Sequence, residues 1–371
     1  MKKIIIAVLS AILLAAAVTA LAGCSDKNTI VLNVYNWGEY ISTGEEGTYN
    51  TNKEFEKWYY ETYGQKIRVN YETFDSNESL RAKLETGAVK YDVIVPSDYM
   101  IEYFIEKDML AELNFDNIPE YKNIDEKYRN LHYDPENKYT VPYTYGVVGI
   151  IYDANEVDPA DVTGWEVMWN EKYSGEILQF NNSRDAFGTA MYMLGLDVNS
   201  NDKTVWDTAV AKLKEQIPLR KSLVMDQIFN MMESGEAAIG AYYAGDFLTM
   251  QSEQADNVDL RFFVPEHSNV YVDAMCVLKT SEHKEAAEAY INFMLTEDAA
   301  VANSLMHCYS SPNSLVLNSA EYKEEMGEEA LAVLYPEGYD FASAYEKYAF
   351  RNLDTETLDY MTSLWEDYLI S

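Results

Sequence analysis

The chain has few of the residues on which metal-dependent and covalent catalysis depend. Its 371 residues include 3 cysteines and 4 histidines. It contains neither a Gly-x-Ser-x-Gly elbow nor a His-Glu-x-x-His motif, which are typical of serine hydrolases and zinc proteases. We expect His132, His267, His283 and His307 to be solvated surface residues, because none lies beside an evident nucleophile. Acidic residues are abundant, so a glycosidase-like pair of carboxylates stays open as an alternative.

Basic residues are also scarce. The chain has 28 Lys and Arg against 62 Asp and Glu, which gives a formal net charge of −34. This charge disfavours nucleic acid as a partner, because binding to phosphates requires basic patches. An acidic surface attracts cationic solutes, although the same charge also serves solubility alone.

Long apolar runs are absent except at the N-terminus. Lys2 and Lys3 precede an apolar run over residues 4–21, which is typical of a secretory signal. The run ends in Leu-Ala-Gly-Cys, which resembles the bacterial lipoprotein box with Cys24 as the lipidated mature N-terminus. Two or more acyl chains give stable anchoring. A plain membrane anchor and an ordinary cleaved signal are the alternatives.

The predicted processing leaves an acidic body outside the cell. Residues 1–23 form the signal peptide, residues 24–28 form a tether, and the loss of Lys2 and Lys3 changes the formal charge from −34 to −36. Cys276 and Cys308 then remain in the body, and in an exported protein they either pair or pack as free thiols.

Helical and strand patterns alternate along the body, which predicts an α/β fold with crossover connections. The first helix has capping-box spacing at Thr51 and Glu54 and ends at Gly64. We predict helices at 51–63, 75–87, 100–107, 184–195, 204–216, 284–295, 298–305 and 355–370, and a further helix after Gly245 and Asp246. We predict strands at 31–35, 67–71, 91–95, 141–146, 147–152, 177–180, 237–243, 260–264 and 271–278.

The chain is predicted to cross twice between two lobes that enclose a cleft. The crossings fall near Pro142 and Tyr271, where strands follow loop-like segments. Lobe 1 comprises residues 29–141 plus 273–310, and lobe 2 comprises residues 142–272 plus 311–371. Such an arrangement closes by hinge motion at the crossings.

Aromatic and acidic residues gather where the predicted strands begin or end. In open α/β sheets, ligands bind outside the carboxyl ends of the strands. Carboxylates and aromatic faces together suit an ammonium group. The candidates are Trp37, Tyr40, Ser97, Tyr99, Asn182, Asp185, Tyr243, Tyr271 and Asp273.

Several of these candidates also have a purely structural interpretation. Trp37 and Tyr40 could seal the core, Asn182 could be a helix N-cap, and Asp185 could simply favour a helix N-terminus. Asp273 differs from them, because a carboxylate within an apolar strand requires a partner.

Four motifs in order resemble the spermidine/putrescine-binding proteins of polyamine ABC transporters. They are Tyr-Asn-Trp-Gly-Glu-Tyr (35–40), Tyr-Asp-Val-Ile-Val-Pro-Ser-Asp-Tyr (91–99), Val-Pro-Tyr-Thr-Tyr-Gly (141–146) and Tyr-Val-Asp-Ala-Met (271–275). The resemblance implies a two-lobed periplasmic-binding-protein (type II) fold with the ligand in the cleft between the lobes. It implies that Asp273 and Asp185 hold amines, that Ser97 forms a hydrogen bond with the ligand, and that five aromatics enclose the methylene chain: Trp37, Tyr40, Tyr99, Tyr243 and Tyr271.

The chain departs from that family at five positions. Tyr243 and Tyr271 stand where well-known members have Trp, and Asn182 stands where they have a carboxylate. Asp98 replaces a usual Thr, and Arg351 falls near a Gln that contacts ligand. These changes keep the ligand class but leave the choice among polyamines open.

The predicted function is extracytoplasmic polyamine binding and delivery to an ABC permease with its ATPase. We expect a lipid-anchored monomer on the outer face of the cell membrane, without catalytic activity, metal or cofactor. One alternative is ferric-ion binding, because the adjacent Tyr242 and Tyr243 resemble ferric-binding relatives of the same fold. An extracellular hydrolase is the other alternative.

Overall fold

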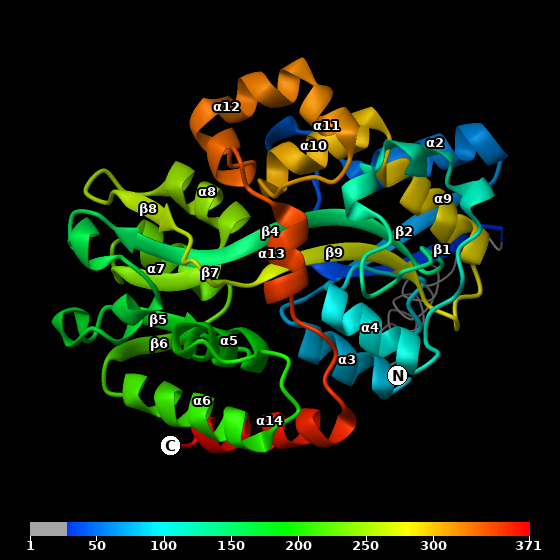
Figure 1. Ribbon diagram of the computed structural model, residues 1–371. Coiled ribbons are helices and arrows are strands. Elements are labelled where there is room, and N and C mark those ends of the chain that lie inside the picture. The colour runs from blue at the N-terminus through cyan, green and yellow to red at the C-terminus, as the bar shows by residue number, and fades with distance from the viewer. Residues whose placement is uncertain (1–27) are drawn as a thin grey trace, which may run out of the picture.

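The computed structural model describes residues 28–371 (Figure 1). The predicted signal peptide, the lipidation at Cys24 and the tether up to residue 27 lie outside the described residues. Within residues 28–371, no helix is both long and apolar enough to cross a membrane.

A mixed sheet of nine strands runs through the molecule. Strands at its two ends are parallel to their neighbours, as expected where helices connect them, whereas the central strands β9 and β4 are antiparallel. In spatial order the strands are β2 (Ile67–Phe74), β1 (Ile30–Trp37), β3 (Val93–Ile94), β9 (Val270–Val277), β4 (Thr140–Asp153), β7 (Ile239–Tyr243), β5 (Ile177–Phe180) and β6 (Arg220–Val224), with β8 (Leu260–Phe263) also paired to β4.

Strand β4 connects the two halves of the sheet. Its residues 140–147 pair with β9, and its residues 148–152 pair with β7. The strands predicted at 141–146 and 147–152 are therefore one continuous strand of 14 residues. Both β4 and β9 cross the middle of the molecule (Figure 1). The lobe boundaries given above stay predictions.

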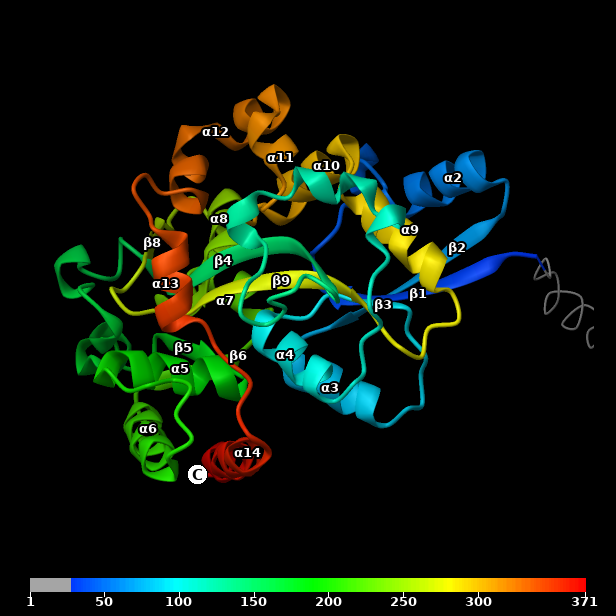
Figure 2. The same cartoon turned by 45° about the vertical axis from the view of Figure 1, so that its right-hand side comes forward.

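Helices cover both halves of the sheet (Figures 1 and 2). One half carries α2 (Thr51–Tyr63), α3 (Asn77–Glu85), α4 (Asp98–Glu106), α9 (Lys284–Met294) and α10 (Glu297–His307). The other half carries α5 (Ser183–Leu194), α6 (Lys203–Gln216), α7 (Gln227–Glu233), α8 (Ala244–Glu253) and α14 (Thr355–Leu369). Between them lie α11 (Ser314–Asn318), α12 (Ala320–Leu334) and α13 (Phe341–Tyr348), of which α13 packs on β9.

Some local predictions were wrong. The N-cap of α2 is Asn50, whose side chain accepts a hydrogen bond from the Lys53 amide at 3.0 Å, and not Thr51. Thr51 instead donates to Asn303 at 2.6 Å, a tertiary contact that sequence spacing does not reveal. Five further elements were not predicted: β6, α7, α11, α12 and α13. In α12 the backbone of Gly327 has a φ of 73°, which interrupts the helix.

Both cysteines of the body are free thiols. Cys276 is buried in β9, and Cys308 follows the last turn of α10. This resolves the alternative that the sequence left open: the described chain has no disulfide between them.

Candidate functional site

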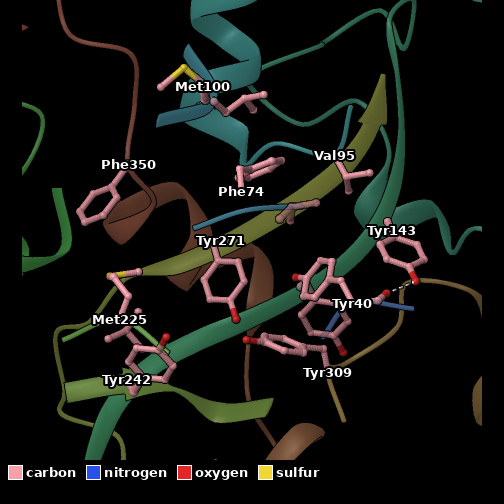
Figure 3. Close-up of a cluster of buried hydrophobic side chains, with 14 of the residues drawn as sticks. Tyr40, Phe74, Val95, Met100, Tyr143, Met225, Tyr242, Tyr271, Tyr309 and Phe350 are labelled. Carbon is pink, nitrogen blue, oxygen red and sulfur yellow. Dashed lines mark hydrogen bonds between the residues drawn. The ribbon is translucent and has the colours of Figure 1, made fainter. Parts of the chain in front are cut away.

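A cavity of about 350 Å³ lies where several strands begin or end, between the two halves of the molecule. Residues of the loops after β1, β3 and β7 line it, together with the first residues of β9. Tyr40, Tyr242, Tyr271 and Tyr309 converge in this region (Figure 3). Eight of the predicted residues line the cavity: Trp37, Tyr40, Ser97, Tyr99, Asp185, Tyr243, Tyr271 and Asp273.

Asp273 lies on β9 and is only 3% exposed. The Tyr40 hydroxyl donates a hydrogen bond to Asp273 Oδ2 at 2.5 Å, whereas Asp273 Oδ1 has no partner in the described chain. Burial raises the pKa of Asp273 to about 6, and the hydrogen bond from Tyr40 opposes that rise. One oxygen of this carboxylate is thus free to accept a hydrogen bond within the cavity.

Asp185 lies in the first turn of α5. Its Oδ2 accepts hydrogen bonds from the Tyr243 hydroxyl at 2.8 Å and from Asn182 Nδ2 at 2.9 Å. Burial raises the pKa of Asp185 to about 6, and the hydrogen bond from Tyr243 opposes the rise. Asn182 itself does not line the cavity. It is the N-cap of α5, and its side-chain oxygen accepts a hydrogen bond from the Asp185 amide at 2.9 Å.

Four further aspartates line the cavity, of which Asp75 and Asp226 are exposed whereas Asp98 and Asp246 are not. Asp246 on α8 accepts a hydrogen bond from the Tyr309 hydroxyl at 2.7 Å, and burial raises its pKa to about 7. Asp98 is buried and accepts from the amides of Tyr99 and Val272, while burial raises its pKa to about 8. We refer to Asp98, Asp185, Asp246 and Asp273 as the cavity aspartates.

Asp246 and Tyr309 were not among the ligand-binding candidates predicted from the sequence. A signal was present, because Asp246 follows the predicted strand that ends at Tyr243. Their contact joins residues 63 positions apart, so only the fold reveals it. Gly245 makes room for it, since a Cβ there would lie 2.6 Å from the Tyr309 ring.

His307 is buried, which corrects the prediction that all four histidines are surface residues. Its Nδ1 accepts a hydrogen bond from the Tyr309 amide at 2.9 Å. Its ring packs against Tyr40 and Tyr143, and burial lowers its pKa to about 3. A neutral His307 therefore supports the loop that carries Tyr309.

The structure does not bring Arg351 into the cavity. Its guanidinium forms a bidentate ion pair with Glu102 on α4, at 3.0 Å and 3.3 Å, and 44% of its side chain is exposed. The buried cation near the cavity is Arg184, whose guanidinium lies 4.4 Å from the ring centre of Phe350 and 5.5 Å from that of Tyr99. The hydrogen-bond acceptors of Arg184 are neutral oxygens.

Aromatic rings form much of the remaining cavity wall. Trp37 packs on Phe74 with 4.5 Å between ring centres, and the rings of Tyr243 and Tyr271 meet edge to face at 5.5 Å. Four buried polar atoms of cavity residues have no hydrogen-bond partner in the described chain: Trp37 Nε1, Asn269 Oδ1, Tyr271 Oη and Asp273 Oδ1. Because buried polar groups are nearly always paired, these atoms mark where a polar ligand would bind.

The ferric-ion alternative depends on the adjacent Tyr242 and Tyr243. Across residues 28–371, no group of three or more His, Cys, Asp or Glu side chains could hold a metal ion. The adjacent tyrosines point to different carboxylates, since Tyr242 donates to Asp226 at 3.3 Å and Tyr243 donates to Asp185.

Comparison with known proteins gives consistent matches. Residues 52–328 match the family model described as "Bacterial extracellular solute-binding protein". The chain is 30% identical to the spermidine/putrescine-binding periplasmic protein of Escherichia coli over 311 residues, which cover 81% of this chain and 83% of that protein. It is 27% identical to the putrescine/agmatine-binding protein of Pseudomonas aeruginosa over 358 residues, or 91% and 94% of the two chains.

The solved structures agree. The spermidine/putrescine ABC transporter substrate-binding protein PotD of Streptococcus pneumoniae superimposes with a TM-score of 0.70 at 31% identity, over 92% of this chain and 99% of that one. The predicted α/β periplasmic-binding-protein fold is therefore confirmed.

Proposed function

The chain belongs to the family of bacterial extracellular solute-binding proteins, and from this premise we propose that it binds a polyamine in the cavity and delivers it to an ABC permease with its ATPase. The family is one of solute-binding proteins and not of enzymes. Its relatives include a spermidine/putrescine-binding protein, and both of these ligands are flexible cations. We infer that the same class of ligand binds here.

The observation that carries the proposal is the presence of two unpartnered buried acceptor oxygens, on Asp273 and Asn269, among carboxylates and aromatic rings. An ammonium group has several N–H donors, and both Asp273 Oδ1 and Asn269 Oδ1 can accept from it. Ring faces attract the cation by about 0.5–2 kcal/mol each and also pack against methylene groups. A cavity of about 350 Å³ is within the range of small-ligand sites.

Asp185 and Asp273 are proposed to hold two amines, and Asp246 offers a third carboxylate. Their tyrosine partners each donate one hydrogen bond, which leaves lone pairs for the ligand. Trp37 and Tyr271 would enclose the methylene chain. Asn182 would act through Asp185, and Arg351 would act outside the cavity, at Glu102.

Closure of the two lobes over the ligand is proposed to occur at the crossings near Pro142 and Tyr271. Strand β4 supports this location, because it exchanges its partner between Val147 and Val148. A ligand closes the lobes only to the extent that it makes better contacts in the closed state. The proposed lobes are residues 29–141 plus 273–310 and residues 142–272 plus 311–371.

Lipid anchoring at Cys24 is proposed to hold the protein, as a monomer, on the outer face of the cell membrane. The Leu-Ala-Gly-Cys sequence after an apolar run supports this proposal. Acylation is tested by labelling cells with a radioactive fatty acid, with Cys24→Ser as the control that should lose the label.

Calorimetric titration tests the ligand class. Putrescine, cadaverine, spermidine, spermine and ferric iron are titrated separately into the purified protein, and at least one polyamine is expected to bind. Absence of binding by all four polyamines would contradict the proposal. A coloured ferric complex would instead favour metal binding, and hydrolysis of a glycoside or ester by the pure protein would favour an enzyme.

A further inference from the structure

The C-terminal end of α2 carries two exposed tyrosines beside the first described residues. Tyr60 is 53% exposed and Tyr63 is 55% exposed. Tyr60 also borders a groove of about 550 Å³ that is lined by Asn28, Thr29, Ile30, Gly64, Gln65, Lys66 and His283. We call the exposed surface of residues 57–68 at this end of α2 the tether face.

The charge of the tether face is opposite to that of the chain as a whole. Residues 57–68 contain Lys57, Lys66 and Arg68 but a single acid, Glu61, and all four side chains are exposed. Lys57 also forms an ion pair with Glu54, one turn earlier on α2, at 3.5 Å. In the whole chain, acids outnumber basic residues by 62 to 28. This face is therefore a site where the protein can approach an anionic surface despite its net charge.

The length of chain before Asn28 limits how far this face can lie from the membrane. Only four residue steps separate the proposed lipid-bearing Cys24 from Asn28, and four steps span at most about 14 Å. Since Asn28 lines the groove beside Tyr60, the acyl chains must enter the bilayer close to the tether face.

We propose that the tether face rests on the outer surface of the membrane, with the Tyr60 and Tyr63 rings at the level of the lipid headgroups and with Lys57 and Arg68 near lipid phosphates. Tyrosine is enriched at membrane interfaces because its ring is apolar and its hydroxyl is polar. Basic side chains near an anionic bilayer are attracted to its surface. This inference rests on the proposed anchoring at Cys24.

The arrangement separates membrane contact from ligand binding. Strand β1 starts at Ile30, next to the tether face, and ends at Trp37 in the cavity. Seven residue steps along a strand span about 23 Å. Figure 2 shows β1 running from the α2 side of the molecule toward its centre. The cavity therefore stays above the bilayer, and changes to the tether face leave ligand affinity unaltered.

Photo-crosslinking of the full-length lipoprotein in vesicles tests the proposal. A photoreactive phenylalanine derivative replaces Tyr60, Tyr63 or, as the control, Tyr339, which is 39% exposed and follows α12, far along the chain from the tether face. The vesicles contain phosphatidylcholine and phosphatidylglycerol. Lipid adducts are expected at positions 60 and 63 in roughly tenfold excess over position 339, because the tether holds this face at a high effective concentration of lipid.

A charge reversal adds a second measurement. Lys57→Glu is expected to lower the lipid adducts at position 63 several-fold, whereas the exposed control Lys347→Glu leaves them unchanged. Both variants should retain the polyamine affinity of the wild type, which shows that they are folded.

The outcomes separate this inference from the proposals on which it rests. Equal lipid adducts at positions 63 and 339 in an acylated protein would overturn the proposal that the tether face rests on the membrane, and would leave the anchoring at Cys24 untouched. Adducts to a permease subunit in native membranes, in place of lipid, assign the face to that subunit and also overturn the proposal. If Cys24 carries no fatty acid and Cys24→Ser changes nothing, then the anchor itself is wrong, while polyamine binding is judged by its own titration.

Discussion

Replacing Asp273 by asparagine removes a buried charge from the cavity and preserves the shape of the side chain. Asp273 Oδ1 is the unpartnered carboxylate oxygen that is proposed to accept from a ligand amine. Removing one member of a buried, hydrogen-bonded charge pair costs about 2–5 kcal/mol of binding free energy. This corresponds to a dissociation constant raised by about 30-fold to about 5,000-fold.

The same substitution should not weaken the ligand-free protein. Burial raises the pKa of Asp273 from 3.8 to about 6, so the ionised carboxylate destabilises the folded state at neutral pH. A shift of this size corresponds to about 3 kcal/mol. Asp273→Asn is therefore expected to leave the free energy of unfolding unchanged or to raise it by up to that amount. Lost affinity without lost stability is the signature of a ligand-binding residue.

Asp92→Asn serves as the matched control. Asp92 is buried, accepts hydrogen bonds from the Asn33 amide at 2.8 Å and from the Ser281 hydroxyl at 2.6 Å, and lies outside the cavity. We expect it to lose about 1–3 kcal/mol of stability with no change in affinity. Calorimetry measures affinity and urea unfolding measures stability. The reasoning about Asp273 is refuted if Asp273→Asn binds the preferred polyamine within about threefold of the wild type.

Trp37→Ala should weaken polyamine binding by about 0.5–2 kcal/mol from the lost ring face, with a further loss from packing, and calorimetry that finds wild-type affinity would make this loop structural. Gly245→Ala would place a Cβ 2.6 Å from the Tyr309 ring, and urea unfolding should show a loss of about 1–3 kcal/mol of stability. As the control, Gly38→Ala should be tolerated, because its Cβ would lie 3.6 Å from the nearest atom, Asp226 Oδ2. Arg351→Gln should change polyamine affinity little, because Glu102 holds the guanidinium outside the cavity; a tenfold effect in calorimetry would show that Arg351 reaches the ligand. Because the pKa values of the cavity aspartates are raised, protons compete with the ligand between pH 8 and pH 5.5, and polyamine affinity should fall as the pH falls. Over the same range the unfolding temperature of the ligand-free protein should rise as the pH falls, because the folded state binds more protons than the unfolded state. Calorimetry in buffers of different ionisation enthalpy should detect proton release on binding.

The sequence was sufficient to locate most of the cavity because strand ends obey a simple geometric rule. Trp37 and Tyr243 end β1 and β7, Tyr99 follows β3, and these three strand ends meet at the cavity. The pattern of apolar residues identified most of the strands, and the alternation of strands and helices predicted an α/β sheet with crossover connections.

The residues that sequence reasoning misplaced are those whose side-chain direction depends on tertiary contacts. Arg351 lies near the expected position along the chain, but Glu102, one turn after Asp98 on α4, holds its guanidinium outside the cavity. Asn182 was expected either to contact ligand or to cap α5, and the structure shows the cap. Tyr309 was not identified because its partner Asp246 belongs to a distant helix.

Tyrosine explains how this cavity remains acidic although it is largely desolvated. Burial favours the neutral form of each carboxylate, whereas a hydrogen bond from a tyrosine hydroxyl lowers the pKa of Asp185, Asp246 and Asp273. Tyr243 thus supplies both a ring face toward the cavity and a hydroxyl that donates to Asp185 at 2.8 Å. Tyr243→Phe would keep the ring and remove the donor, which should raise the pKa of Asp185 further and shift the loss of polyamine affinity to a higher pH. If the pH profile of binding were the same in this variant, then the hydroxyl would not be what keeps Asp185 ionised.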